Sequence, residues 1–127
     1  MARISRNHIR IFAMLCFVLL LAALFIGGRQ PGAGSLFRVP WDKVVHLTFY
    51  GTLTILAGIA LPKIKLPILF FIIVSIGGID ELLQIYIPGR HAGFDDLAAD
   101  TVGCLIALFL VPWFTRKLDD KLNKANF

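Results

Sequence analysis

The chain has little negative charge and few residues that favour water. Only eight of its 127 residues are Asp or Glu, against 13 Lys and Arg, and 57% of all residues are hydrophobic. A soluble domain of this length does not carry so much apolar surface, so the composition argues against a soluble fold. It indicates a single membrane domain over residues 1–127.

Cysteine is scarce as well. Cys16 and Cys104 lie inside two different apolar runs and are expected at different depths in a membrane, so no disulfide is predicted. No Cys/His spacing resembles a structural zinc site. The basic residues are dispersed among apolar segments rather than gathered into one patch, which argues against nucleic acid as a partner.

Four apolar runs are long enough to span a bilayer as helices. They cover residues 11–27, 44–61, 66–87 and 97–113, and a charged tail follows over residues 115–127. The sequence therefore predicts an all-α membrane protein built as a bundle of four transmembrane helices. The first run ends without a small-x-small cleavage site, so we expect it to remain as a helix rather than to be removed as a signal peptide.

Lys and Arg are shared unequally between the two sides of such a bundle. One side receives nine of them: Arg3, Arg6, Arg10, Lys63, Lys65, Arg116, Lys117, Lys121 and Lys124. The other side receives Arg29, Arg38, Lys43 and Arg90. The positive-inside rule places the nine in the cytoplasm, and both the N and the C terminus with them.

Five of the eight acidic residues fall between Asp80 and Gly103, at the expected outer ends of the third and fourth helices. A carboxylate within a bilayer costs about 2.5–3.5 kcal/mol or more unless it is paired, hydrated, protonated or bound to an ion. The cluster therefore predicts a polar site between helices. Since this side faces away from the cytoplasm, we expect the site to meet lipid head groups and wall intermediates rather than ATP.

The helical period places further polar residues beside this cluster. Asp42, His46 and Tyr50 are four residues apart and form one stripe on the second helix, where a carboxylate can fix the tautomer of the histidine. Glu81 and Gln84 share a face of the third helix. Asp80, one residue from Glu81, is expected nearer the flank of the helix than Glu81.

Asp96 and Asp100 are four residues apart and repel each other if both are ionised. A cation, a proton or an Arg or Lys partner removes that penalty. Three arrangements fit: an ion-pair network, a protonated acid that donates a hydrogen bond, or a divalent cation held by carboxylates. For the last arrangement the candidate ligands are Asp96, Asp100 and Glu81, and a divalent cation is the one cofactor that the pattern suggests.

The order and spacing of these motifs resemble the VanZ-like family of small bacterial membrane proteins. The motifs are Asp42-Lys43-x-x-His46-x-x-x-Tyr50, Glu81-x-x-Gln84, Pro88-x-Arg90 and Asp96-x-x-x-Asp100-x-x-Gly103. The resemblance covers about residues 41–110, and Asp100 departs from it, because the family usually has Asn there. It implies a multi-pass protein of the bacterial cytoplasmic (inner) membrane. The family takes its name from a member associated with low-level resistance to the glycopeptide antibiotic teicoplanin.

The resemblance and the polar cluster together predict an envelope protein that binds or modifies a cell-envelope lipid or wall intermediate and affects glycopeptide susceptibility. The expected partners are membrane lipids, a lipid-linked wall intermediate or the glycopeptide itself. Arg90 and Lys43 suit an anionic head group, and Glu81 with His46 are the catalytic candidates. The remaining substrate-binding candidates are Asp42, Tyr50, Gln84, Asp96 and Asp100.

Two other function classes stay open. In one, the protein is a non-enzymatic scaffold or binding protein whose polar residues pair only with each other. In the other, it is an ion or proton carrier. The sequence leaves open whether the protein is an enzyme.

Overall fold

The computed structural model describes residues 5–125, so Arg3 and the two chain ends of the orientation prediction lie outside the described residues. Four α-helices follow one another: α1 (Arg6–Phe25), α2 (Trp41–Ala60), α3 (Leu66–Gln84) and α4 (Phe94–Ala125). Two short 3-10 helices, η1 (Gly27–Arg29) and η2 (Ala33–Ser35), lie between α1 and α2. Each of the four α-helices is long and apolar enough to cross a membrane. The prediction of an all-helical membrane bundle is confirmed for the described residues.

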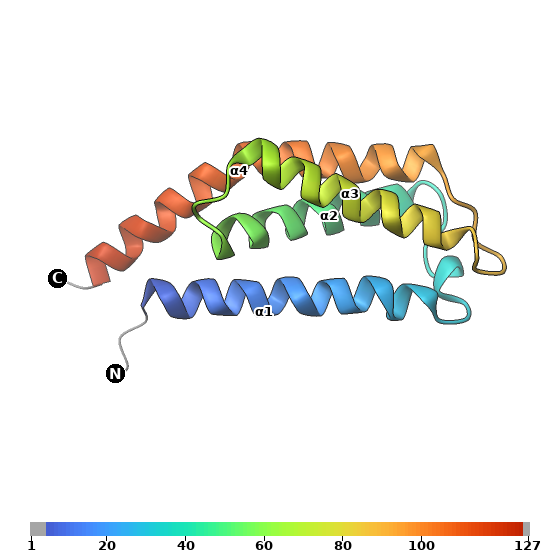
Figure 1. Ribbon diagram of the computed structural model, residues 1–127, viewed down its shortest axis with the longest axis horizontal. Coiled ribbons are helices and arrows are strands. Elements are labelled where there is room, and N and C mark those ends of the chain that lie inside the picture. The colour runs from blue at the N-terminus through green and yellow to red at the C-terminus, as the bar shows by residue number, and fades with distance from the viewer. Residues whose placement is uncertain (1–4, 126–127) are drawn as a thin grey trace.

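The helices run side by side along the long axis of the molecule (Figure 1). α4 packs most extensively on α2, and α1 packs on the other side of α2. α1 begins and α4 ends at the same end of the bundle, where Arg6 Nε lies 3.3 Å from Asp119 Oδ1. Arg6 Nη2 also donates a hydrogen bond of 3.1 Å to Asn123. The opposite end is formed by η1, η2 and the loop over residues 85–93.

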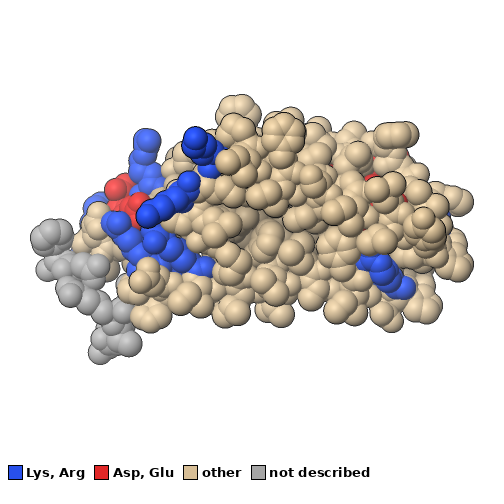
Figure 2. Space-filling model, in the orientation of Figure 1, with Lys and Arg blue, Asp and Glu red and all other residues tan. Residues whose placement is uncertain are grey.

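The core is apolar and follows the helical period. Its buried members recur every three or four residues: Tyr50, Leu53 and Ala57 of α2, Leu69 and Ile73 of α3, and Cys104 of α4. The outer surface is also apolar, since Phe12 and Leu19 of α1 are each 68% exposed. Figure 2 shows a broad middle band without charged side chains, with Lys and Arg gathered at the end where α1 begins. An apolar band of this kind suits contact with lipid tails.

Two glycines set the closest approach of α2 and α4. A Cβ atom on Gly103 would overlap the backbone carbonyl oxygen of Leu47, and one on Gly51 would lie 3.3 Å from the carbonyl oxygen of Gly103. Small residues allow helices in a membrane to pack backbone against backbone in this way. The contact brings the polar side chains of α2 and α4 within reach of each other one turn away.

The helix bounds differ from the sequence prediction at both ends of the chain. α1 starts at Arg6, capped by the Ser5 side chain, rather than at residue 11. α4 does not stop near residue 113 but continues to Ala125, so the described part of the predicted charged tail is helical. At about 1.5 Å per residue its 32 residues span about 48 Å, longer than a bilayer core of about 30 Å. Pro112 lies within α4, and the helix turns toward the start of α1 over its C-terminal part (Figure 1).

Candidate functional site

The candidate site lies where the start of α2, the end of α3 and the start of α4 meet. Its outermost part is an ion cluster around Lys43. The Lys43 ammonium lies 3.2 Å from Asp42 Oδ2 and 2.7 Å from Asp95 Oδ2, and it also bonds Asp96 Oδ1. Because three carboxylates already pair with this ammonium, Lys43 is not available to bind an anionic ligand.

A buried pair lies one helical turn deeper. His46 Nδ1 of α2 is 2.8 Å from Asp100 Oδ1 of α4. The Asp100 side chain is completely buried, whereas the His46 side chain is 17% exposed. The second oxygen of Asp100, Oδ2, has no hydrogen-bond partner among the described residues. The pair therefore joins α2 to α4 and leaves one carboxylate oxygen unused.

The end of α3 carries a second polar group. The Gln84 amide donates to Asp80 Oδ2 at 3.0 Å and to Glu81 Oε1 at 3.2 Å. The backbone N–H of Gly93 donates to Glu81 Oε2 at 2.9 Å, which ties the 85–93 loop to the helix. Arg29 of η1 approaches from the other side, with Nη2 at 3.8 Å from Asp80 Oδ1. Asp80, Glu81 and Gln84 are all buried, and Asp80 is only 3% exposed.

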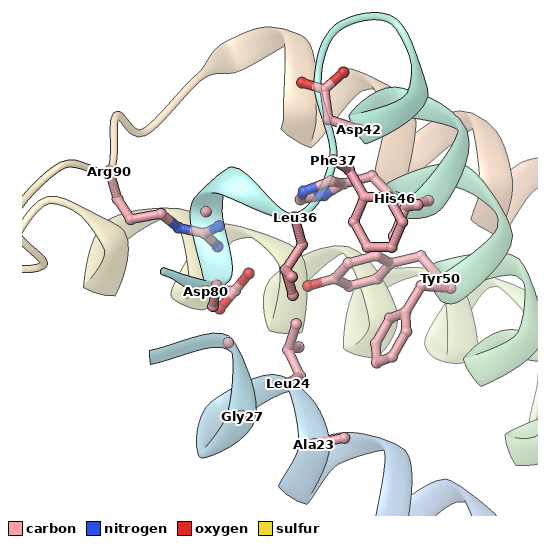
Figure 3. Close-up of a pocket in the computed structure, with 15 residues that line it drawn as sticks. Ala23, Leu24, Gly27, Leu36, Phe37, Asp42, His46, Tyr50, Asp80 and Arg90 are labelled. Atoms are coloured by element: carbon pink, nitrogen blue, oxygen red, sulfur yellow. The ribbon is translucent and has the colours of Figure 1, made fainter. Parts of the chain in front are cut away.

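A pocket of about 420 Å³ opens beside these groups, between α1, the η1–η2 loop and α2 (Figure 3). Its polar lining consists of Asp42, His46, Tyr50, Asp80 and Arg90. Its apolar lining includes Ala23, Leu24, Leu36, Phe37, Val45 and Phe49. The pocket therefore has one polar wall and one apolar wall, an arrangement that suits an amphiphilic molecule.

Two donors and one acceptor of the pocket lining lack a hydrogen-bond partner among the described residues, and the acceptor is Asp42 Oδ1. The Tyr50 hydroxyl and the Arg90 Nε are buried, and neither has a hydrogen-bond partner among the described residues. Figure 3 shows the two side chains entering the pocket from different elements, Tyr50 from α2 and Arg90 from the loop after α3. A buried donor without a partner costs about 1–3 kcal/mol. A ligand that accepts hydrogen bonds from both would recover that cost.

The predicted site residues therefore separate into three places. Asp42, His46, Tyr50 and Arg90 line the pocket. Glu81, Gln84 and Asp100 are buried behind it. Lys43 and Asp96 form an ion pair within the ion cluster, in the outermost part of the site.

Sequence reasoning missed two residues of the site. Asp80 was expected nearer the flank of α3 than Glu81, yet it is buried and lines the pocket. Arg29 was only counted among the four basic residues of the outer side, yet it lies 3.8 Å from Asp80. A signal for Asp80 was present in the sequence. Gly77, Asp80, Glu81 and Gln84 follow one another at i, i+3, i+4 and i+7, which is the spacing of a single buried helix face.

Three of these residues can also hold a metal ion. His46, Glu81 and Asp100 each offer a ligand atom, and the three atoms lie within 4.8 Å of one another. Asp96, a metal candidate from the sequence, does not belong to this group and contacts Lys43 instead.

A family model described as VanZ/LLP1 matches residues 7–115, which include all four helices in whole or in part. No curated protein and no solved structure gives a significant match.

Proposed function

Since this chain belongs to the VanZ/LLP1 family, we propose that it is a multi-pass protein of the bacterial cytoplasmic membrane that binds an anionic cell-envelope lipid or lipid-linked wall intermediate in the pocket between α1 and α2. The observation that carries the proposal is the two-sided lining of this pocket, with Arg90 and Tyr50 on one wall and aliphatic and aromatic side chains on the other. Its volume of about 420 Å³ suits a head group together with the first part of an acyl or isoprenoid chain.

Arg90 is the head-group ligand in this proposal. Its guanidinium presents a planar fork of donors that matches phosphate and carboxylate, and its Nε has no hydrogen-bond partner in residues 5–125. Lys43, the other cation expected to hold a head group, already has three carboxylate partners. The Asp80 carboxylate lines the same pocket and can accept hydrogen bonds from sugar or glycerol hydroxyls.

The membrane orientation supports an envelope ligand. The pocket lies at the end of the bundle opposite the Arg6–Asp119 ion pair, and eight of the 13 basic residues belong, among the described residues, to the end that this pair marks. The positive-inside rule then turns the pocket away from the cytoplasm. A protein that holds a wall intermediate there would shield the intermediate from a glycopeptide such as teicoplanin. It would thereby change glycopeptide susceptibility.

A second candidate function is chemical modification of the bound lipid. His46 favours it, because this imidazole lines the pocket and is oriented by a buried carboxylate, Asp100, at 2.8 Å. A general base is commonly arranged in this way. Glu81, the other catalytic candidate, is bonded to Gln84 and Gly93 and does not line the pocket.

The described residues give less support to the two other function classes, a scaffold and an ion or proton carrier. A scaffold whose polar groups pair only with each other does not account for the free donors of Tyr50 and Arg90. An ion or proton carrier needs ionisable or polar groups along the whole bundle. Apart from Thr54, the buried described residues toward the cytoplasmic end are apolar, as at Leu53, Leu69 and Val111.

The proposal is tested by mass spectrometry of the lipids that co-purify with the protein in mild detergent. We expect one class of anionic envelope lipid or lipid-linked intermediate to be enriched over its share of the membrane, and the enrichment to be lost in Arg90→Gln. Lys43→Gln is the matched control, since it removes one positive charge at the same end of the bundle but outside the pocket. Equal lipid profiles for the wild type and Arg90→Gln would refute the assignment of Arg90.

A further inference from the structure

We propose that His46, Glu81 and Asp100 form a binding site for one divalent transition-metal ion, Zn²⁺ or Mn²⁺, between α2, α3 and α4. The three ligand atoms lie within 4.8 Å of one another. Donors bound to one ion at about 2.1 Å lie within about 4.2 Å of each other, so side-chain movements of about 1 Å or less complete the coordination. The site is independent of the lipid proposal, because a protein that binds no lipid can still hold the metal.

Charge is the first argument for a cation. Glu81 is 6% exposed and Asp100 is 1% exposed, and neither has an Arg or Lys within ion-pair distance in residues 5–125. The partners of Glu81 are an amide and a backbone N–H, and that of Asp100 is an imidazole. Two buried carboxylates without a fixed cation are costly. One divalent ion neutralises both.

The unused oxygen of Asp100 is the second argument, and it is independent of the first. Asp100 Oδ2 is buried without a hydrogen-bond partner. It faces α3 at Gly77, one helical turn below Glu81, where a Cβ atom added to the glycine would lie 2.9 Å from this oxygen. Because Gly77 has no side chain, Oδ2 lies close against α3, the helix that also carries Glu81.

The ligand set indicates the class of metal. One imidazole and two carboxylates form a mixed nitrogen and oxygen site, which suits Zn²⁺, Mn²⁺ or Fe²⁺. Ca²⁺ and Mg²⁺ prefer oxygen ligands alone. With three protein ligands the ion keeps at least one position for water or for an oxygen of a pocket ligand, and His46 connects the site to the pocket lining.

A metal at this position also changes the role of His46. A ring nitrogen that binds the ion has no lone pair left for taking up a proton at that atom. A metal-bound His46 therefore cannot act as the general base of the second candidate function. The lipid-binding proposal is unchanged.

The test is the metal content of the purified protein, with an affinity tag that contains no histidine. Elemental mass spectrometry is expected to find about one Zn²⁺ or Mn²⁺ per chain, or to find this amount after chelation and re-addition of either ion. Asp100→Asn and Glu81→Gln should weaken binding at least about tenfold. Asp96→Asn, one turn away on the same helix and paired with Lys43, is the matched control and should keep the wild-type affinity.

Three results would overturn the site. The first is a wild-type protein that takes up neither ion stoichiometrically, which needs no variant to fold. The second is a folded Asp100→Asn or Glu81→Gln protein, monodisperse and helical by circular dichroism, with unchanged affinity. Loss of metal in Asp96→Asn alone would move the site to the outer ion cluster and equally refute the assignment. Lipid enrichment measured on the same samples separates failure of this site from failure of the lipid pocket.

Discussion

His46 Nδ1 of α2 lies 2.8 Å from Oδ1 of Asp100 of α4, between side chains that are 17% and 0% exposed. This contact joins the two helices that pack most extensively in the bundle, and it holds a carboxylate that has no other partner among the described residues. The stability of the bundle and the chemistry of its site therefore depend on the same pair.

The pair predicts a strong effect of removing one partner. His46→Leu leaves Asp100 buried without its hydrogen bond, and we expect a loss of stability of about 3 kcal/mol or more. The double variant His46→Leu/Asp100→Leu removes the buried charge as well and should recover much of that loss. Thermal unfolding in detergent with a chelator present measures both, and additive effects of the two substitutions would show that the residues do not interact.

The neighbouring glycines of α3 offer a matched comparison. Gly77→Ala places a Cβ 2.9 Å from Asp100 Oδ2, whereas Gly78→Ala meets no atom within 4 Å. We expect Gly77→Ala to lower stability by about 1–3 kcal/mol through overpacking. Gly78→Ala should be neutral or slightly stabilising, because Ala favours the helix. Equal unfolding midpoints for the two variants would contradict the close contact of Gly77 with Asp100.

The close crossing of α2 and α4 predicts that two glycine substitutions there differ in how strongly they impair folding. Gly103→Ala forces a Cβ into the backbone carbonyl of Leu47, which a side-chain rotation cannot relieve, so the helices must separate and little folded protein is expected. Gly51→Ala brings its Cβ to 3.3 Å from a carbonyl oxygen and should be tolerated with a modest loss. The yield of monodisperse protein on size-exclusion chromatography distinguishes the two. A stable Gly103→Ala protein would mean that the backbones lie further apart.

The orientation of the bundle is tested by single cysteines in a background with Cys16→Ala and Cys104→Ala. Ala92 and Lys63 are both exposed and lie in loops at opposite ends of the bundle. The positive-inside rule predicts that Ala92→Cys reacts with a membrane-impermeant thiol reagent in intact spheroplasts and that Lys63→Cys reacts only after permeabilisation. The reverse pattern would turn the pocket toward the cytoplasm and exclude an extracytoplasmic wall intermediate as its ligand.

The sequence predicted the helices well because their signal is local. Apolar runs of sufficient length predict the four helices without any knowledge of how they pack. The end of α4 was misplaced because Pro112 and the charges that follow it signal the end of a membrane segment, which does not require the helix itself to end. A helix can continue past the end of its apolar segment, as α4 does to Ala125.

The site was harder to predict because its partners are far apart in the sequence. Glu81 and Asp80 both become buried because the 85–93 loop and η1 fold over the end of α3, supplying Gly93 to one acid and Arg29 to the other. The helical period of α3 alone contains no information about those loops. Likewise, the charge of Lys43 suggested a ligand site, and only the positions of α2 and α4 reveal the carboxylates that occupy it.

Site-specific photo-crosslinking tests whether the pocket selects an anionic envelope amphiphile. A photoreactive amino acid replaces Leu36, which lines the pocket, or, as the control, Phe109, which is 84% exposed on α4. The account predicts that the Leu36 adducts, identified by mass spectrometry, are dominated by one anionic lipid class and lose this selectivity in Arg90→Gln. The Phe109 adducts should follow the composition of the bulk membrane. Adducts of bulk composition at both positions would contradict the claim.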